Sequence, residues 1–339
     1  MKPFDYYSLT SVDQAVALLT KYQDKAALLA GGSDLLGLMK DGISGPDMKP
    51  PTHLLDVRRI RGSGAITEQA SGLRIGAAVT LTDLATSPVI AGNYSLLADA
   101  ARQVAVPQIR NVATLGGNLC QRPRCWYFRN KLFSDCLRKG GSACYAQEPE
   151  SENQNHSVVG NTPCAMVCPS DLALALVALD ARAEIAGPKG RRTVTLEKFH
   201  MSADVNFKRE TVLAPNELLV AVEIPAAARG RKGVYFKVRE RQAFDFAQVS
   251  VALSVALSGS QVKDARVVFG GVAPFPLRSA QAESLLKGKQ IGQQNVSALR
   301  AVAAEACTVA LKGAKPLSKN GYKLRMASGA LEQSLIMLA

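Results

Sequence analysis

Six of the seven cysteines in this 339-residue chain fall within one window of about fifty residues, and this clustering is the strongest constraint in the sequence. The window opens at the glycine pair Gly116-Gly117 and closes at Pro169-Ser170-Asp171. Between these motifs stand Cys120, Cys125, Cys136, Cys144, Cys164 and Cys168. Cysteines gathered in this way indicate a site, and the rest of the sequence has to show what the site serves.

Three kinds of cysteine site fit the spacing to different degrees. Zinc ligands usually come in close pairs such as C-x2-C, which Cys164-x3-Cys168 and Cys120-x4-Cys125 only approach. A disulfide framework is disfavoured in a reducing compartment. An iron–sulfur cluster needs four thiolates, and their spacing can be irregular where a long loop wraps the cluster. The residues alone rank iron–sulfur first, zinc second and disulfides third, and all three stay open.

The compartment follows from the lack of targeting signals. The first residues, Met1 to Tyr7, contain neither a long apolar run nor a twin arginine, so we expect no signal peptide. The longest apolar stretch, residues 172–179, is far shorter than the roughly 20 residues that span a bilayer. We therefore expect a cytoplasmic protein without a membrane span, or a periplasmic one only if a partner subunit carries it across.

Two glycine elements each follow a short apolar segment. Residues 26–30 are predicted to form a buried strand that runs into Gly31-Gly32-Ser33-Asp34, with a helix over 35–40. Such a turn presents free backbone N–H groups to an anion such as a pyrophosphate. It matches neither a Rossmann fingerprint nor a P-loop, so alone it is also explained by a tight strand-to-helix turn. The second glycine pair, about 85 residues later, favours two loops converging on one elongated anionic cofactor.

The formal charge of +13 is partly concentrated around the cysteines. Residues 101–147 hold eight basic residues against a single acidic one, Asp135. A solvated loop explains this, and so would cations that balance a thiolate-ligated cluster. A nucleic-acid groove is not expected, because the aromatic cluster there is limited to Trp126-Tyr127-Phe128. Only three histidines are present, which favours electron transfer over hydrolytic acid–base chemistry.

The remaining chain predicts an α+β protein of two domains. Helical periodicity covers residues 11–22, 96–104 and 172–178, and strands are expected at 53–57, 72–77, 183–186 and 193–196. Residues 217–225 are predicted to form an edge strand, because Pro225 ends it, and 226–233 a basic, flexible linker. Beyond it, strands at 234–238, 249–258 and 265–269 and helices at 279–286, 296–311 and 322–338 predict a small domain with Cys307 in its core.

Five motifs, in this order, resemble the FAD-binding medium subunit of molybdenum hydroxylases, the xanthine dehydrogenase and aldehyde oxidoreductase family. They are Ala30-Gly31-Gly32-Ser33-Asp34-Leu35-Leu36, Arg110-Asn111-Val112-Ala113-Thr114-Leu115-Gly116-Gly117-Asn118, Pro169-Ser170-Asp171-Leu172-Ala173, Pro215-Asn216-Glu217-Leu218-Leu219 and Phe269-Gly270-Gly271-Val272-Ala273-Pro274. The resemblance covers essentially the whole chain. It implies an FAD-binding domain of the vanillyl-alcohol-oxidase (PCMH) type with two α/β subdomains over residues 1–228, a cysteine-rich insertion over about 119–166, and a CO-dehydrogenase-flavoprotein-like α/β domain over 229–339.

The resemblance also implies which residues bind cofactors. FAD would contact Ala27, Leu28, Leu29, Ala30, Gly31, Gly32, Ser33, Asp34, Leu35, Thr114, Gly117, Asn118, Asp171 and Lys237. It would be bound non-covalently, since no Arg-Ser-Gly-Gly-His pattern precedes the glycine pair. The insertion resembles the branch represented by 4-hydroxybenzoyl-CoA reductase and periplasmic-type aldehyde oxidoreductases, whose subunit carries a [4Fe-4S] cluster. Cys125, Cys136, Cys144 and Cys164 match its ligands, and Cys120 or Cys168 is a possible replacement for one of them.

The function implied is that of an oxidoreductase subunit that transfers electrons and supplies no catalytic residue of its own. Its expected partners are a large molybdopterin-binding subunit, a small [2Fe-2S] subunit and an external electron acceptor or donor. The substrate would be an aldehyde, an aromatic or heterocyclic compound, or a hydroxybenzoyl-CoA-type thioester. Two alternatives stay open: a self-contained flavin oxidoreductase and a zinc-stabilised basic binding protein.

Overall fold

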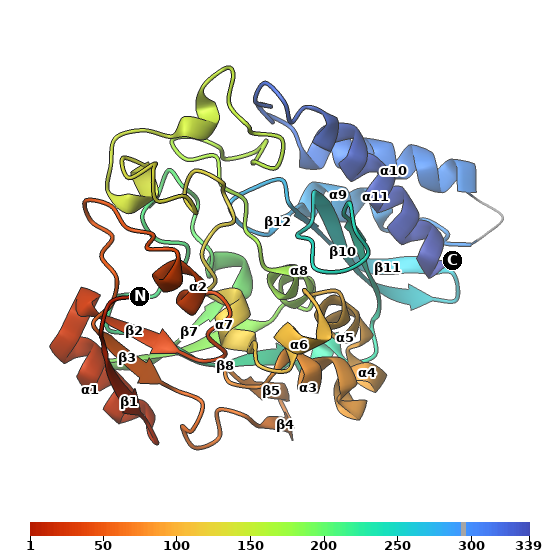
Figure 1. The fold of residues 1–339 in the computed structure, drawn as a ribbon. Helices are drawn as coiled ribbons and strands as arrows, with labels where there is room; N and C mark the ends of the chain where they lie inside the picture. The colour runs from red at the N-terminus through yellow and green to blue at the C-terminus, as the bar shows by residue number, and fades with distance from the viewer. Residues whose placement is uncertain (293–295) are drawn as a thin grey trace.

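The computed structural model describes residues 1–292 and 296–339. Within these residues the strands form three sheets, two in the N-terminal part of the chain and one in the C-terminal part (Figure 1). This arrangement confirms the predicted α+β class, with two α/β subdomains followed by a small α/β domain. No helix of the described ranges is both long enough and apolar enough to cross a membrane.

The first subdomain is a parallel sheet of order β1-β3-β2. Its strands are β1 (Asp5–Ser8), β2 (Ala26–Leu29) and β3 (His53–Asp56). Helix α1 (Val12–Tyr22) covers it and buries Ala15 and Leu19. The side chain of Ser11 accepts a hydrogen bond from the Gln14 N–H and caps α1, as Ser at this position is expected to do. The short helix η1 (Gln23–Lys25) directly precedes β2. The first glycine loop follows the end of β2 and leads into α2 (Leu35–Lys40).

The second sheet has the order β4-β5-β8-β6-β7 and is antiparallel throughout. Its strands are β4 (Ile66–Gln69), β5 (Gly72–Gly76), β6 (Arg182–Gly187), β7 (Gly190–Thr195) and β8 (Leu218–Pro225). The prediction of an edge strand at 217–225 was wrong, because β8 lies in the centre between β5 and β6. Pro225 is the last residue of β8 and pairs with Gly72, so its missing N–H affects only the end of the ladder.

Helices pack on this second sheet and join it to the C-terminal domain. They are α3 (Leu81–Thr86), α4 (Pro88–Asn93), α5 (Ser95–Arg102), α6 (Pro107–Arg110), α7 (Leu115–Leu119), α8 (Asp171–Ala178) and η4 (Leu196–Lys198). All eight residues of α8 are buried, which matches its uniformly apolar sequence. The core around α8 includes Tyr235, Ala252 and Val268 of the C-terminal sheet, so the two domains share one continuous apolar interior.

The C-terminal domain is an antiparallel sheet of order β12-β11-β10-β9 covered by helices. Its elements are β9 (Lys232–Val238), β10 (Val249–Ser258), β11 (Gln261–Gly270), β12 (Leu277–Arg278), α9 (Ala280–Leu286), α10 (Val296–Ala310) and α11 (Tyr322–Leu338). Cys307 is buried in its core, as predicted. The stretch 226–233, predicted as a flexible linker, is structured: η5 (Ala226–Ala228) begins it, and Arg231 donates to Ser254 and Asp264. The domain boundary at residue 229 stays a prediction.

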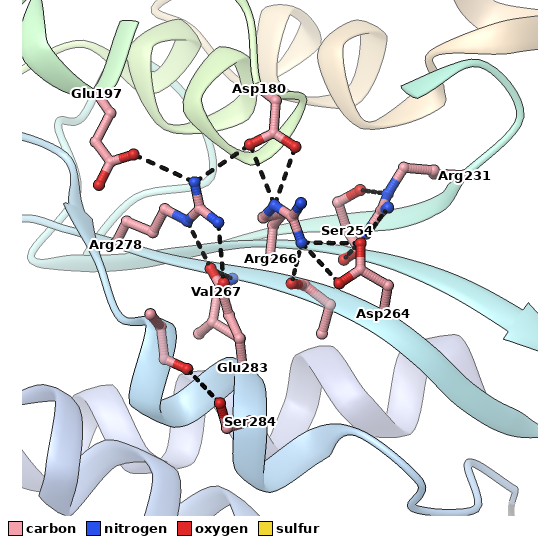
Figure 2. A network of polar contacts seen from close by, with 12 residues as sticks. Asp180, Glu197, Arg231, Ser254, Asp264, Arg266, Val267, Arg278, Glu283 and Ser284 are labelled. Atoms are coloured by element: carbon pink, nitrogen blue, oxygen red, sulfur yellow. Dashed lines mark hydrogen bonds and ion pairs between the residues drawn. The ribbon is translucent and has the colours of Figure 1, made fainter. Parts of the chain in front are cut away.

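A network of ion pairs also ties the two domains together (Figure 2). Asp180, at the end of α8, accepts hydrogen bonds from Arg266 Nε at 3.0 Å and from Arg278 Nη1 at 3.2 Å. Arg278 also pairs with Glu197 and with Glu283. Because Asp180 and Glu197 belong to the N-terminal part and both arginines to the C-terminal sheet, the network fixes how the sheet sits against α8.

Residues 120–168, called the cysteine segment below, have little regular structure. The structure describes this segment in full, and its helices are two short 3-10 turns, η2 (Leu137–Lys139) and η3 (Tyr145–Gln147). In Figure 1 the cysteine segment, coloured yellow to green, lies above α2 and beside the C-terminal helices. Asn320 Nδ2 fastens it to that domain by donating to the carbonyls of His156 and Ser157, each at 3.1 Å.

Buried charges hold the interior of the cysteine segment. Lys139 is 0% exposed, and its Nζ donates to the carbonyls of Asn130 at 2.7 Å, Phe133 at 3.1 Å and Tyr127 at 3.4 Å. Arg138 pairs with Glu210 at 2.5 Å. The segment thus folds around hydrogen-bonded cations, together with small apolar clusters at Phe128 and at Met166.

Candidate functional site

The two predicted glycine loops meet at one cavity of about 340 Å³, called the glycine cavity below. Most of the residues predicted to bind FAD line it: Leu28, Ala30, Gly31, Gly32, Ser33, Asp34, Leu35, Thr114, Gly117, Asn118, Asp171 and Lys237. Ala27 and Leu29 do not line it. They pack with Met39 and Leu54, because side chains alternate between the two faces of β2.

Close backbone contact brings the two loops together. A Cβ on Gly31 would lie 2.0 Å from the carbonyl oxygen of Val112, so only glycine fits at this point. The second loop is fixed by the Gly116 N–H, which donates to the Ala77 carbonyl at 2.8 Å, and by Thr114, whose side chain caps α7. Since α2 has six residues and α7 five, their summed peptide dipoles are small.

Asp171 and Lys237 form a buried ion pair on the cavity wall. Lys237 Nζ lies 2.8 Å from Asp171 Oδ2, and the Tyr235 hydroxyl donates to Asp171 Oδ1. Burial, with the nearby Asp171 carboxylate, raises the pKa of Tyr235 well above its usual value, so the phenol keeps its proton. The sequence predicted Asp171 and Lys237 as two separate FAD contacts, whereas the structure makes them a single paired unit.

Asp34 is engaged by the cysteine segment. Its carboxylate accepts hydrogen bonds from the Arg122 N–H at 2.9 Å and from Arg129 Nη2 at 2.6 Å, and forms an ion pair with Arg124 Nη2 at 2.9 Å. We call Asp34 and these three arginines the Asp34 junction. Although Asp34 lines the glycine cavity, most of its hydrogen-bonding capacity is therefore directed away from any ligand there.

Sequence reasoning missed several residues that close the glycine cavity. Arg124 lines it, and its guanidinium stacks on Phe246 at 4.8 Å from the ring centroid. Burial lowers the pKa of Arg124 to about 10. Phe244 and Asp245 come from the loop between β9 and β10, where the Phe244 N–H donates to the Ala105 carbonyl at 3.1 Å. The sequence signal that could have indicated this part of the cavity wall was the pair of phenylalanines within a short charged loop.

The four cysteines predicted to bind the cluster come together. Cys125, Cys136, Cys144 and Cys164 line a single gap of about 10 Å³, called the cysteine cavity below. Cys120 lines the glycine cavity instead, and Cys168 packs in the apolar core around α8. Within residues 1–292 and 296–339, no three His, Cys, Asp or Glu side chains are arranged to hold a single metal ion.

Local electrostatics distinguish these thiols. Burial raises the pKa of Cys125 to about 12 and also raises that of Cys136. The neighbouring Cys144 thiol lowers the pKa of Cys164 to about 6, and Arg138 adds to this effect. His156 Nε2 lies 3.2 Å from Cys125 Sγ, and burial lowers the pKa of His156 to about 4, so the imidazole is neutral. This soft sulfur set, with cations behind it, suits a metal–sulfur group.

A third cavity, of about 230 Å³, lies between the other two. It shares Arg124, Asp171, Asp245 and Phe246 with the glycine cavity, and Cys125 and His156 with the cysteine cavity. The two candidate cofactor sites are therefore separated by a few side chains on one continuous wall.

Comparison with known proteins identifies the family. Residues 2–227 match the model of the FAD binding domain in molybdopterin dehydrogenase, and residues 234–337 match the CO dehydrogenase flavoprotein C-terminal domain. The chain belongs to this family. It is thus a flavoprotein of the oxidoreductase class, which confirms the resemblance drawn from the motifs and decides against a zinc-stabilised binding protein.

Individual relatives align with this flavoprotein over nearly its whole length. The aldehyde oxidoreductase FAD-binding subunit PaoB of Escherichia coli is 37% identical, covering 99% of this chain and 98% of its own. The carbon monoxide dehydrogenase medium chain of Hydrogenophaga pseudoflava is 31% identical, covering 98% and 96%. A solved structure of carbon monoxide dehydrogenase from the same organism superposes with a TM-score of 0.73 at 28% identity, covering 98% of this chain and 96% of that one.

The glycine cavity suits the FAD that the family binds. Its lining combines glycine backbone with apolar and aromatic side chains such as Leu28, Leu219 and Phe246. A dinucleotide with a diphosphate between flat rings requires both kinds of surface. The comparisons leave the cluster, the ligand residues and the substrate open.

Proposed function

We propose that this flavoprotein is the electron-transfer subunit of a heteromeric molybdenum hydroxylase, with FAD in the glycine cavity and one [4Fe-4S] cluster on Cys125, Cys136, Cys144 and Cys164. One observation carries the proposal: a cavity lined by two glycine loops and a cavity lined by four thiols share a wall through the third cavity between them. Two redox groups placed so close would exchange electrons directly.

At the glycine cavity, the chain's own residues bind and orient the flavin. Gly31 and Gly117 let the backbone approach a diphosphate, and the Asp171–Lys237 pair gives the wall a fixed polar group. Phe246 and Leu219 offer apolar surface to flat rings. FAD, when bound, supplies both one-electron and two-electron chemistry, which suits a subunit that exchanges electrons with an outside acceptor or donor.

At the cysteine cavity, the donor set supports a cluster more than a single metal ion. Four thiols face one gap, and Lys139 and Arg138 place two buried cations beside them, which would offset the charge of ligated thiolates. His156 Nε2 lies 3.2 Å from Cys125 Sγ, where an Nε2–H tautomer would donate to a ligated thiolate.

The partners follow from the proteins that this chain resembles. Its relatives include an aldehyde oxidoreductase subunit and medium chains of carbon monoxide dehydrogenase. We infer a large molybdopterin-binding partner that converts an aldehyde or an aromatic or heterocyclic substrate, or that reduces a hydroxybenzoyl-CoA-type thioester, and a small [2Fe-2S] partner that relays electrons. Thiolate ligands favour assembly in the reducing cytoplasm.

The test is cofactor content of the full chain, purified without oxygen. We expect one FAD and about four iron atoms per chain. The Cys144→Ser variant should lose most of the iron and keep FAD, while Cys307→Ser, which alters a core cysteine of the C-terminal domain, should keep both. Zinc in place of iron would contradict the cluster. Substrate turnover by the chain without partners would instead identify a self-contained flavin oxidoreductase.

A further inference from the structure

We propose that the Asp34 junction couples the two cofactor sites, so that FAD binds more tightly to a chain whose cysteine cavity holds its cluster. The inference rests on the proposed cluster and goes beyond it, because two cofactors can occupy one chain without affecting each other. Asp34, Arg124 and Arg129 would then act as positioning residues that link the sites.

On the flavin side, Asp34 belongs to the glycine loop itself. It follows Gly31-Gly32-Ser33 on the cavity wall and directly precedes α2. Its carbonyl accepts from the Leu38 N–H at 3.2 Å, and the Gly32 carbonyl accepts from the Leu36 N–H at 3.0 Å. A shift of Asp34 therefore moves the start of α2 and the two glycines before it.

On the cluster side, every donor to the Asp34 carboxylate in the junction comes from residues 122–129, the turn that contains Cys125. Arg129 closes this turn. Its Nε donates to the Pro123 carbonyl at 2.7 Å, its Nη2 to the Arg122 carbonyl at 2.9 Å, and its backbone N–H to the Cys125 carbonyl at 2.9 Å. Cys125 cannot change position without disturbing the turn that holds Asp34.

The junction is sheltered enough to transmit such a change. The side chains of Asp34 and Arg129 are each 18% exposed, and charged hydrogen bonds away from water are short, directional and strong. Arg122 and Arg129 lie 88 and 95 residues from Asp34 along the chain, so the junction joins two segments that are distant in sequence. Arg129 does not line the glycine cavity, so it can act on FAD only through residues that do, such as Asp34 and Arg124.

Binding of a cluster at the cysteine cavity is the event that the Asp34 junction would transmit to the glycine cavity. Cys125 is one of the four thiols of the cysteine cavity and lies within the 122–129 turn, so ligation of a cluster there would fix this turn in one arrangement. An element with two arrangements that contacts both sites is the physical requirement for coupling. Coupling between binding equilibria is reciprocal, so bound FAD should also stabilise the cluster against loss.

The experiment measures the dissociation constant of FAD, by quenching of flavin fluorescence, on the full chain before and after reconstitution with ferrous iron and sulfide under anaerobic conditions. We expect FAD to bind about tenfold more tightly to the reconstituted chain. In the Arg129→Met variant, the ratio of the FAD dissociation constants without and with the cluster should fall from about ten to near one. The matched control is Arg102→Met, which removes an exposed arginine paired with Asp99 on α5, and it should keep the gain.

The outcomes separate this inference from the proposed function. Equal FAD affinity in the iron-loaded and iron-free wild-type chain overturns the coupling and leaves both cofactors in place. A gain that persists in Arg129→Met overturns the role of the junction. If Arg129→Met does not fold, the wild-type comparison and protection of the cluster by FAD against chelation decide the question. A chain that binds FAD but never takes up iron contradicts the proposed cluster, and the coupling fails with it.

Discussion

The glycine cavity and the cysteine cavity are built in different ways. Short, regular elements form the first: β2 leads into Gly31, Thr114 caps α7, and the apolar core around α8 lies behind. The second is formed by an irregular segment whose interior is organised by Lys139 and by the Arg138–Glu210 pair.

This difference predicts which kind of substitution disrupts each cavity. A cavity defined by close backbone contact tolerates no added volume, because backbone atoms cannot move aside. A segment held by a buried cation fails when the cation is lost, because its carbonyl partners are left buried without donors. The regular region is therefore expected to be most sensitive to steric change, and the irregular region to changes in hydrogen bonding and charge.

The largest effect is expected for Gly31→Ala in the glycine cavity. The new methyl group would lie 2.0 Å from the Val112 carbonyl oxygen, and we expect a loss of stability of about 3 kcal/mol or more together with loss of FAD. Thermal unfolding and flavin content measure both. The control is Gly37→Ala in α2, whose Cβ would meet nothing within 4 Å, and which should be neutral or stabilising by about 0.5 kcal/mol. Normal FAD binding by Gly31→Ala would contradict the steric account.

The next effect concerns the interior of the cysteine segment. Lys139→Met removes the donor to three carbonyls, at Tyr127, Asn130 and Phe133, and we expect a cost of about 2–3 kcal/mol and poor iron retention. Denaturant unfolding and iron analysis are the measurements. Lys131→Met, an exposed lysine of the same segment, should change neither. If both variants behave alike, charge alone rather than the buried bonds organises the segment.

A smaller, pH-dependent effect is expected at His200, which donates to a backbone carbonyl at the end of α7. His200 Nε2 lies 2.9 Å from the Leu119 carbonyl, and burial lowers the pKa of His200 from 6.5 to about 4. Below about pH 6.5 the unfolded chain therefore binds a proton that the folded chain does not. The free energy of unfolding consequently decreases as the pH is lowered from about 6.5 to about 4. From about pH 6.5 to 5 this single group should remove about 2 kcal/mol.

The variant that checks this linkage is His200→Gln, whose amide can still donate to the Leu119 carbonyl but does not titrate in this range. Unfolding free energies of both proteins, measured by denaturant at about pH 7 and about pH 5, should show a smaller loss in the variant. An identical loss would mean that other groups cause the acid sensitivity.

The smallest effect is expected outside both cavities, in the network of Figure 2. Asp180→Asn weakens the pairs with Arg266 and Arg278, but the site is partly exposed, and we expect a cost of about 0.5 kcal/mol that shrinks at high salt. Asn tolerates the positive φ of 52° at this position, so backbone strain should not contribute. Melting temperatures at low and high salt measure the effect. A loss comparable to that of Lys139→Met would remove the contrast between the buried and the exposed network.

The sequence alone predicted the features that depend on neighbouring residues. The glycine turn at Gly31-Gly32 and the uniformly apolar helix α8 are set by local conformation and local polarity. The motif order also indicated the α+β class and the grouping of four cysteines. Such features can be read along the chain, because the atoms that produce them are a few residues apart.

Only the tertiary structure decided which side chains use one another as partners. It placed β8 in the centre of its sheet, since the pairing of a strand depends on distant strands and not on its terminal proline. In the folded chain Asp171 pairs with Lys237, 66 residues away, and Asp34 accepts hydrogen bonds from arginines some ninety residues away. A motif comparison, in contrast, treats both aspartates as FAD contacts. A carboxylate binds the nearest well-placed donor, and only folding determines which donor that is.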